Sequence, residues 1–515
     1  MDLGSQIDLA KTYAAAGRFD EMLATCRDIC TNTDQVNMLL ATGALLAGYG
    51  FLSDARAVYQ CARNRAPTDL RAQVNLANLA REAAEHSNAR SLYEELQQKL
   101  PNHPVIRRNA LVGQEYDPGV SDFARKSAAI KWGRWAIAQA GGFKPRPAFG
   151  DLESRPLRVG YVSGDICQHT VGLFVKDVLK AHNPERVVPI VYSAGMVKDW
   201  VTNEVAAACT LHDVSSVDDV SLADQIRLDN IDVLVDLSGH TGGSRLTVFA
   251  YRPTPVMISW LGYFATTGLQ YIDAVILDAW HASDDVEDQF IEPIVKMNSR
   301  FCYKAVPWMP EVAIAPVMQN GYVTFGSFNN TAKLNDGVIE VWSKILAVIP
   351  DARLILKWRT FNDADFRQRV SQAFADRGIA ADRIELRGPS FHADLLKEYG
   401  DIDIALDPFP FTGGLTSCEA LYCGVPVVTV PQSRVVSRQT FAFLNQIGLQ
   451  ELAAEDMEDY ISISVELASN SDRLKTLRAS LRSRMISSPL MDVQGFTREL
   501  EDRLIRLYHT IQADE

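Results

Sequence analysis

The stretch DIALDPFPFTGGLTSCEAL, residues 403–421, carries the strongest fold signal in the chain. Its apolar start predicts a buried strand, its Pro/Gly centre predicts a loop, and Thr416 and Ser417 open a helical pattern. Gly413–Gly414 allow close approach of a ligand to the backbone, and the free N–H groups at a helix start suit a diphosphate. Glu419 falls one turn into the predicted helix, where a carboxylate can accept both hydroxyls of a ribose. A glycine-rich turn capped by Thr416 is the structural alternative.

Outward from this stretch, the same alternation of short apolar runs and helical stretches extends over residues 157–430. The runs form two series, and strands joined by helices are typical of parallel α/β domains. The predicted strands are 157–164, 187–193, 231–239, 256–262 and 274–279 in the first series, and 322–329, 352–358, 383–388, 401–409 and 425–430 in the second. We therefore expect two parallel sheets, with ligands at the carboxyl ends of their strands.

The first 110 residues follow a different pattern, which repeats with a period near 34. Each period holds two short amphipathic helical patterns, and Ala55 and Ala89, like Pro67 and Pro101, are 34 residues apart. This period is typical of tetratricopeptide repeats, which stack into an array with a concave peptide-binding surface. A simple helical bundle is the alternative.

These patterns divide the chain into four segments. We predict helical repeats over residues 1–103 and a helical linker over 104–150, which ends in a Gly/Pro cluster. A first α/β lobe over 151–310 and a second over 311–515, with C-terminal helices, complete the chain.

Composition argues against several classes of function. The 515 residues carry 51 Lys and Arg against 64 Asp and Glu, a net charge of −13, so we expect no nucleic-acid partner. The eight cysteines contain no CxxC pair and no two histidines have metal-ligand spacing, which argues against a disulfide framework or a metal site. There is no signal-peptide pattern and no apolar run approaching ~18 residues, so we expect a soluble, cytoplasmic protein without membrane insertion.

Lys333 lies in a loop that follows the first strand of the second series. A lysine at the carboxyl edge of a sheet can neutralise the charge that grows on a departing diphosphate. A solvated loop lysine is the alternative.

In the first series, His169 and His240 follow the first and third strands, and a loop with Thr266 and Thr267 follows the fourth. The carboxyl ends of parallel strands share one edge of a sheet, so we expect these loops to converge on the ligand cleft.

Collinear motifs resemble one known family, the tetratricopeptide-containing O-linked N-acetylglucosamine transferases and their bacterial and plant relatives, which include a protein O-fucosyltransferase. The similarity extends from the repeats to about residue 512. The motifs are LRVGYVSGD (157–165), DVLVDLSGHTGG (232–243), RPTPVMISWLGY (252–263), FNNTAKL (328–334), DIALDPFPF (403–411), CEALYCGVPVVT (418–429), PQSRVVSR (431–438) and RMISSPLMD (484–492). The resemblance implies an α + α/β chain, in which the repeats precede a GT-B glycosyltransferase of two Rossmann-like lobes.

The resemblance also implies roles for single residues. His169 matches a histidine of the catalytic cleft, proposed as base or as an orienting group, and Lys333 matches the lysine on the donor diphosphate. Thr416, in the phosphate-binding loop with its neighbours Gly413, Gly414 and Ser417, matches a phosphate-binding threonine. Glu419 matches the acidic residue that holds the ribose, and Asn330 takes the place of a family glutamine near the diphosphate.

The chain departs from the family pattern around the base and the sugar. Leu395 stands where most members carry a histidine that packs on the nucleotide base, and Leu173 replaces a second histidine. Leu415 replaces a hydroxyl residue of the phosphate loop, and Tyr263–Thr266 is bulkier than its family counterpart. Contacts to phosphate and ribose are therefore expected to be retained, while the identity of the base and sugar stays open.

The leading hypothesis is an inverting transferase that moves a sugar, N-acetylglucosamine or a related one, from a nucleotide diphosphate to Ser or Thr of a protein. We expect the donor to be uridine-linked, the acceptor to dock on the repeats, His240, Thr266 and Thr267 to border the sugar and acceptor, and neither cofactor nor metal to be needed. A repeat-based binding module with an inactive transferase region is the alternative. A GT-B enzyme acting on free sugars, such as an epimerase, is a third hypothesis, which the repeats disfavour.

Overall fold

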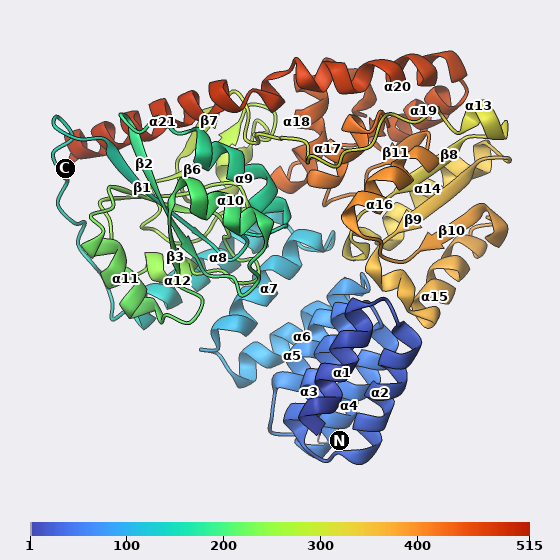
Figure 1. Cartoon of the computed structure of the whole chain (residues 1–515), viewed down its shortest axis with the longest axis horizontal. Helices are drawn as coiled ribbons and strands as arrows, with labels where there is room; N and C mark the ends of the chain where they lie inside the picture. The colour runs from blue at the N-terminus through green and yellow to red at the C-terminus, as the bar shows by residue number, and fades with distance from the viewer. Residues whose placement is uncertain (1–2) are drawn as a thin grey trace. The chain divides into compact units, whose positions relative to one another are not determined.

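The computed structural model describes residues 3–515 and separates into two compact units (Figure 1). The first unit combines the chain up to Asp117 with Val312–Phe409 and Met457–Lys475, and the second combines Pro118–Glu311, Pro410–Asp456 and Thr476–Glu515. The boundaries of the units therefore differ from those of the four predicted segments. The repeats group with most of the second α/β region, and the last helix groups with the first α/β region.

The first unit begins with six helices in three hairpins, as the 34-residue period predicts, followed by a seventh helix. They are α1 (Leu3–Ala15), α2 (Phe19–Asn32), α3 (Val36–Gly48), α4 (Leu52–Arg65), α5 (Arg71–Glu82), α6 (His86–Lys99) and α7 (Pro104–Tyr116). Small residues let neighbouring helices pack closely: a Cβ on Gly43 of α3 would lie 2.4 Å from the Tyr59 ring of α4. Alanines, Tyr93 and Leu96 form the apolar core between α5, α6 and α7.

The α/β part of the first unit is a parallel sheet with helices around it. Its strands β8 (Thr324–Ser327), β9 (Arg353–Lys357), β10 (Ile384–Arg387) and β11 (Ile404–Leu406) lie in the order β10-β9-β8-β11. The accompanying helical segments are α13 (Val317–Asn320), η2 (Thr331–Lys333), α14 (Asp336–Val348), η3 (Arg359–Asn362), α15 (Ala364–Ala375), η4 (Ala381–Arg383), α16 (His392–Glu398), η5 (Tyr399–Asp401) and α19 (Met457–Ala468); α20 (Ser471–Ile486) begins here and ends in the second unit.

Specific polar contacts join the repeats to this sheet. The Asp363 carboxylate accepts from the Ser53 backbone N–H (2.6 Å) and hydroxyl (2.9 Å), and the Arg359 guanidinium pairs with Glu82 at 2.7 Å. Gly50 lies so close that a Cβ there would be 2.0 Å from the Arg359 carbonyl oxygen. The repeats and this α/β region therefore form one packed body.

The second unit holds a seven-stranded parallel sheet in the order β3-β2-β1-β4-β5-β6-β7. The strands are β1 (Leu157–Ser163), β2 (Val187–Ser193), β3 (Thr210–Asp213), β4 (Val233–Asp236), β5 (Val256–Ser259), β6 (Ala274–Asp278) and β7 (Ile294–Met297). The helical segments are α8 (Asp122–Gln139), α9 (Thr170–Ala181), α10 (Trp200–Ala208), α11 (Asp219–Leu228), α12 (Leu246–Phe249), η1 (Val286–Gln289), α17 (Leu415–Tyr422), η6 (Val435–Arg438), α18 (Gln439–Gln446), η7 (Gln450–Leu452), η8 (Pro489–Met491) and α21 (Val493–Asp514), and the short strand β12 (Val427–Val428) also falls in this unit. The two edge strands β3 and β7 were not predicted, because they are four-residue strands with partly exposed, mixed-polarity side chains.

The C-terminal helix α21 packs against the seven-stranded sheet through a buried carboxylate. Glu501 accepts from the Asn183 backbone N–H at 2.8 Å and lies 3.0 Å from Nδ1 of His182. Within residues 3–515, no helix has the length and apolar character that crossing a bilayer requires.

Candidate functional site

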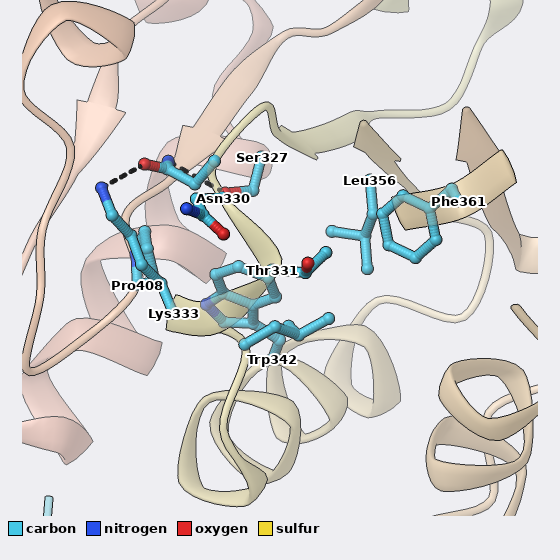
Figure 2. A pocket seen from close by; sticks show the side chains of 10 residues that line it. Ser327, Asn330, Thr331, Lys333, Trp342, Leu356, Phe361 and Pro408 are labelled. Carbon is cyan, nitrogen blue, oxygen red and sulfur yellow. Dashed lines mark hydrogen bonds between the residues drawn. The ribbon is translucent and has the colours of Figure 1, made fainter. Parts of the chain in front are cut away.

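The loop after β8 buries the ammonium group of Lys333 in a small pocket that also contains Asn330, Thr331 and Pro408 (Figure 2). Lys333 is only 9% exposed, so the interpretation as a solvated loop lysine is wrong. Its Nζ donates to Oδ1 of Asn329 at 2.9 Å. Burial lowers the pKa of Lys333 to about 8, although the nearby Asp407 carboxylate raises it. A cation held at this energetic cost is poised to gain from an arriving anion.

Asn330 shapes this loop rather than pointing out of it. Its side-chain Oδ1 accepts from the Ala332 backbone N–H at 3.0 Å and so begins the short helix η2, which ends at Lys333. The next residue, Thr331, is 2% exposed, and its hydroxyl donates to the Glu82 carbonyl oxygen of α5 at 3.1 Å. The repeats therefore help to position the loop that carries Lys333.

Leu395 lies half-buried on α16, and an aromatic side chain that the sequence analysis missed precedes it by one turn. Phe391 is 79% exposed, and its carbonyl oxygen accepts from the Leu395 backbone N–H at 2.9 Å. A large ring left in solvent beside the expected base contact is a candidate stacking surface. The sequence did contain a signal for Phe391, since a large apolar residue directly after the turn Gly388–Ser390 is expected to be exposed.

In the second unit, His169 stands at the N-terminus of α9, just beyond the end of β1. Its Nδ1 accepts from the Val171 backbone N–H at 3.4 Å and lies 3.7 Å from the Asp165 carboxylate. Burial raises the pKa of Asp165, and His169 offsets part of that increase. With Nδ1 as acceptor, Nε2 is the ring nitrogen left to donate, and half of the side chain is exposed to meet a ligand. Leu173, one turn further on, is 5% exposed and belongs to the core.

The glycine loop before α17 is held from α18. Thr440 Oγ1 donates to the Gly413 carbonyl oxygen at 3.3 Å and lies 2.8 Å from the Ser417 hydroxyl. Ser417 is 3% exposed, so its side chain anchors the helix rather than meeting solvent. A Cβ on Gly414 would lie 2.8 Å from Oε1 of the buried Gln439 side chain, which would have to shift to admit it. Thr416 stays half-buried at the helix start.

Glu419 follows on the same helix and is 3% exposed. Burial and the Glu419 carboxylate together raise the pKa of the Tyr303 hydroxyl well above its usual range, and the same two causes raise the pKa of Cys418. A buried acceptor of this kind suits a pair of sugar hydroxyls.

The residues predicted to border the sugar and acceptor have buried side chains with hydrogen bonds in the interior. His240 is 1% exposed, its Nε2 lies 2.9 Å from the Thr267 carbonyl oxygen, and its ring packs edge-on against Trp132. The hydroxyls of Thr266 and Thr267 both donate to Glu292 and are buried. All three side chains are buried in this structure, and their role beside the sugar and acceptor stays a prediction.

A buried arginine, also missed by the sequence analysis, supports the start of that loop. Arg300 is fully buried, and its guanidinium donates to the carbonyl oxygens of Leu261 (3.2 Å) and Tyr263. Leu261 has φ +76°, a left-handed conformation that costs about 1 kcal/mol or more for a residue with a side chain. Burial lowers the pKa of Arg300 to about 9 while Asp278 raises it. Arg300 thus holds a strained backbone in place.

The described residues, 3–515, contain no cluster of three or more His, Cys, Asp or Glu side chains arranged to hold a metal ion. Of the groups described above, the Lys333 ammonium in the first unit and the backbone N–H groups at the start of α17 in the second can meet an anionic ligand.

Comparison with known proteins decides the family. The family model described as "Glycosyl transferase family 41" matches residues 123–305 and 316–500. The chain belongs to glycosyltransferase family 41. The predicted fold class is confirmed by a solved structure, a mutant of the Thermobaculum terrenum O-GlcNAc transferase, which is 30% identical and has a TM-score of 0.90 over 99% of this chain and 98% of its own.

Proteins of plants are similar to this chain in sequence. The "Probable UDP-N-acetylglucosamine--peptide N-acetylglucosaminyltransferase SPINDLY" of Hordeum vulgare is 34% identical over 419 residues, which are 79% of this chain and 44% of that protein. Its namesake in Arabidopsis thaliana is 36% identical over 354 residues, 67% of this chain and 39% of that protein. The chain spans less than half the length of these curated relatives.

Proposed function

We propose that this family 41 chain is an inverting O-linked glycosyltransferase that moves N-acetylglucosamine or a related sugar from a nucleotide diphosphate to Ser or Thr of a protein. One observation carries the proposal: the position of the family's diphosphate lysine is occupied by Lys333, a buried cation of lowered pKa. Keeping a lysine there costs stability, and a leaving diphosphate is the kind of ligand that offsets this cost.

The proposed chemistry assigns each retained residue a part of the donor. The acceptor hydroxyl oxygen forms a new bond to C1 of the sugar, and the bond between C1 and the diphosphate oxygen breaks with inversion. Negative charge grows on the leaving phosphate, and the hydroxyl proton passes to that phosphate or to solvent. The Lys333 ammonium stabilises that charge, as a preorganised donor does. Thr416 and the backbone N–H groups at the start of α17 bind phosphate, and the Glu419 carboxylate accepts hydrogen bonds from the ribose hydroxyls. His169 orients the acceptor or donor through its Nε2–H.

The base is the least constrained part of the donor. Glu419 and Lys333 bind ribose and phosphate and do not discriminate among bases, so a uridine nucleotide is proposed from the relatives' names. Leu395 offers only apolar contact, whereas Phe391 offers a ring. Calorimetry with uridine and guanosine diphosphates on the native chain and on Leu395→His tests this assignment. An unchanged uridine diphosphate affinity would show that Leu395 does not face the base.

The test of the reaction is incubation of the purified chain with UDP-N-acetylglucosamine or GDP-fucose and a Ser/Thr-containing acceptor protein. Released nucleotide and the intact mass of the acceptor are the two readouts. Mass gain with one donor, abolished by Lys333→Met, supports the proposal. The apolar residues at 395 and 415 favour the alternative of an inactive, repeat-based binding module, which predicts nucleotide binding at most and no release with either donor.

Acceptor docking on the repeats is also proposed, from their helical-hairpin architecture. Deletion of residues 1–103 is a poor test, because it strips partners from Asp363, Arg359 and Thr331 as well. Substitutions at exposed repeat positions, scored for mass gain against nucleotide release, separate docking from donor chemistry. The cytoplasmic location stays a prediction.

A further inference from the structure

The last hairpin of the repeats encloses a polar pocket that the proposed donor chemistry does not use. Helices α5, α6 and α7 line it, with Ala89, Ala110 and Gly113 leaving the room and Tyr93 forming a wall. Tyr93 is held by its hydroxyl, which donates to Asn78 at 2.5 Å. The hollow has an empty volume of about 400 Å³, which includes open solvent at its mouth, so the enclosed part suits a small polar group.

Arg81 brings an uncompensated positive charge to this pocket. Arg81 is half-buried as a residue and lines the pocket, and its guanidinium has no hydrogen bond and no ion pair with any residue in the 3–515 range. Other arginines nearby are paired: Arg90 with Asp117, and Arg56 with Glu85 at 2.9 Å. Burial and the positive charge of Arg81 lower the pKa of Arg108, whose guanidinium donates to the neutral Asn109 amide oxygen at 3.2 Å. A half-buried guanidinium without a partner is unusual, because desolvating it costs free energy that a counter-ion normally offsets.

His86 lines the same pocket and is 7% exposed. Its Nε2 has no hydrogen-bond partner among the described residues, while its ring stacks on Tyr116. Burial lowers the pKa of His86, and the Asp117 carboxylate and the Ala332 backbone raise it. An unsatisfied buried ring nitrogen is destabilising, so a ligand able to pair with it would be favoured.

We propose that this pocket binds a carboxylate, supplied by an Asp or Glu side chain of a polypeptide docked on the repeats. The carboxylate accepts from the Arg81 guanidinium. Because His86 already donates to the Ala332 backbone and its Nε2 is unpartnered, Nε2 donates to the carboxylate when His86 is in the imidazolium form, which the carboxylate itself favours. The acids that line the pocket do not compete for Arg81: the Asp117 carboxylate is engaged by Arg90, and Glu94 is exposed at the rim. That the polypeptide is the acceptor of the transferase rests on the proposed function; that the pocket takes a carboxylate does not.

This location links the pocket to the donor loop. His86 contacts the backbone of Ala332, and Ala332 immediately precedes Lys333 in η2. Thr331, the residue before Ala332, donates its hydroxyl to the Glu82 carbonyl oxygen. Glu82 is the last residue of α5, the helix that carries Arg81. A carboxylate that orders Arg81 and His86 therefore acts on the same segment that positions Lys333.

The test is a binding measurement on the full chain without any nucleotide sugar. Two synthetic peptides are compared by fluorescence anisotropy, one with a serine flanked by three glutamates and one with three glutamines in their place. A charge-assisted pair predicts about 10- to 100-fold tighter binding of the glutamate peptide. Arg81→Gln should abolish that preference, and it should not impair folding, because the lost charge has no partner. Lys99→Gln removes the same charge from the exposed end of α6 and is the matched control, which should keep the preference.

The outcomes of these measurements either overturn or support the carboxylate site. Equal binding of the two peptides, or an unchanged preference in Arg81→Gln, removes the carboxylate site. Competition by millimolar inorganic phosphate as strong as that by the glutamate peptide points to a free-anion site instead. A histidine NMR signal of His86 that shifts with the glutamate peptide and stays still with the glutamine peptide supports direct contact. Because no donor is present, failure here leaves the transferase proposal untouched, and an inactive transferase leaves the pocket proposal untouched.

Discussion

Replacing Lys333 by methionine should make the protein more stable and nearly inactive at the same time. Methionine keeps most of the side-chain volume and removes the charge. The ordinary lysine pKa of 10.5 falls to about 8 in the fold, mainly because of burial. At about 1.36 kcal/mol per pH unit, this corresponds to roughly 3 kcal/mol of unfolding free energy that the native chain forgoes near neutral pH. The attraction of Asp407 is already contained in that value.

The pH dependence has a definite sign. Between about pH 8 and pH 10.5 the unfolded chain binds more protons at this lysine than the folded chain, so the stability contributed by Lys333 rises with pH. The advantage of Lys333→Met is therefore complete below pH 8 and disappears near pH 10.5. Urea unfolding of both proteins across this range measures the difference directly. Turnover in the variant should fall by a factor on the order of 10² to 10³.

A second buried lysine of the same sheet provides the matched control. Lys357 is 3% exposed, but its ammonium pairs with Glu398 at 2.9 Å and donates to the Gly388 carbonyl oxygen at 2.8 Å. Lys357→Met should thus lower stability, on the order of 2 kcal/mol, since it breaks satisfied charge-assisted bonds. If Lys333→Met is the less stable of the two variants, or turns over at the native rate, the account of Lys333 as a costly functional cation is refuted.

Four further outcomes are expected. The kcat/KM for the donor should decline above about pH 8 as Lys333 loses its charge, and a profile flat to pH 9.5 would contradict this. Phe391→Ala should weaken nucleotide diphosphate binding by about 10- to 100-fold in calorimetry if the ring stacks on the base, whereas an unchanged affinity removes it from the site. His169→Ala should lower transfer to protein by about 10² to 10⁴ with nucleotide affinity near normal; equal losses in both would mark His169 as a donor-binding or structural residue. Ser53→Ala removes the hydroxyl bond to the Asp363 carboxylate, leaves the Asp363 cap of α15 in place, and should cost about 1–3 kcal/mol in urea unfolding, with no change expected if the repeats and the sheet were independent.

The sequence by itself determined the elements and the position of the phosphate loop. Strands such as Leu157–Ser163 and Arg353–Lys357 are apolar runs bounded by polar turns, and six repeat helices follow a regular period, so local patterns suffice to locate them. The same holds for Gly413–Gly414 before a helix start, since turn chemistry is local. Lys333 could be named because it follows a strand and stands in a recognisable motif.

Only the tertiary structure decided which of these residues are exposed and what charge they carry. Lys333 became a buried cation of lowered pKa, and His240 became a core residue, because side chains distant in sequence close around them. The support of Leu261 by Arg300 and the pairing of Asp363 with Ser53 join segments 39 and 310 residues apart. The edge strand Thr210–Asp213 exists only because β2 offers its backbone partners. Burial, ion pairing and pKa depend on the three-dimensional neighbours of a group, and no periodicity of 2 or 3.6 residues encodes those neighbours.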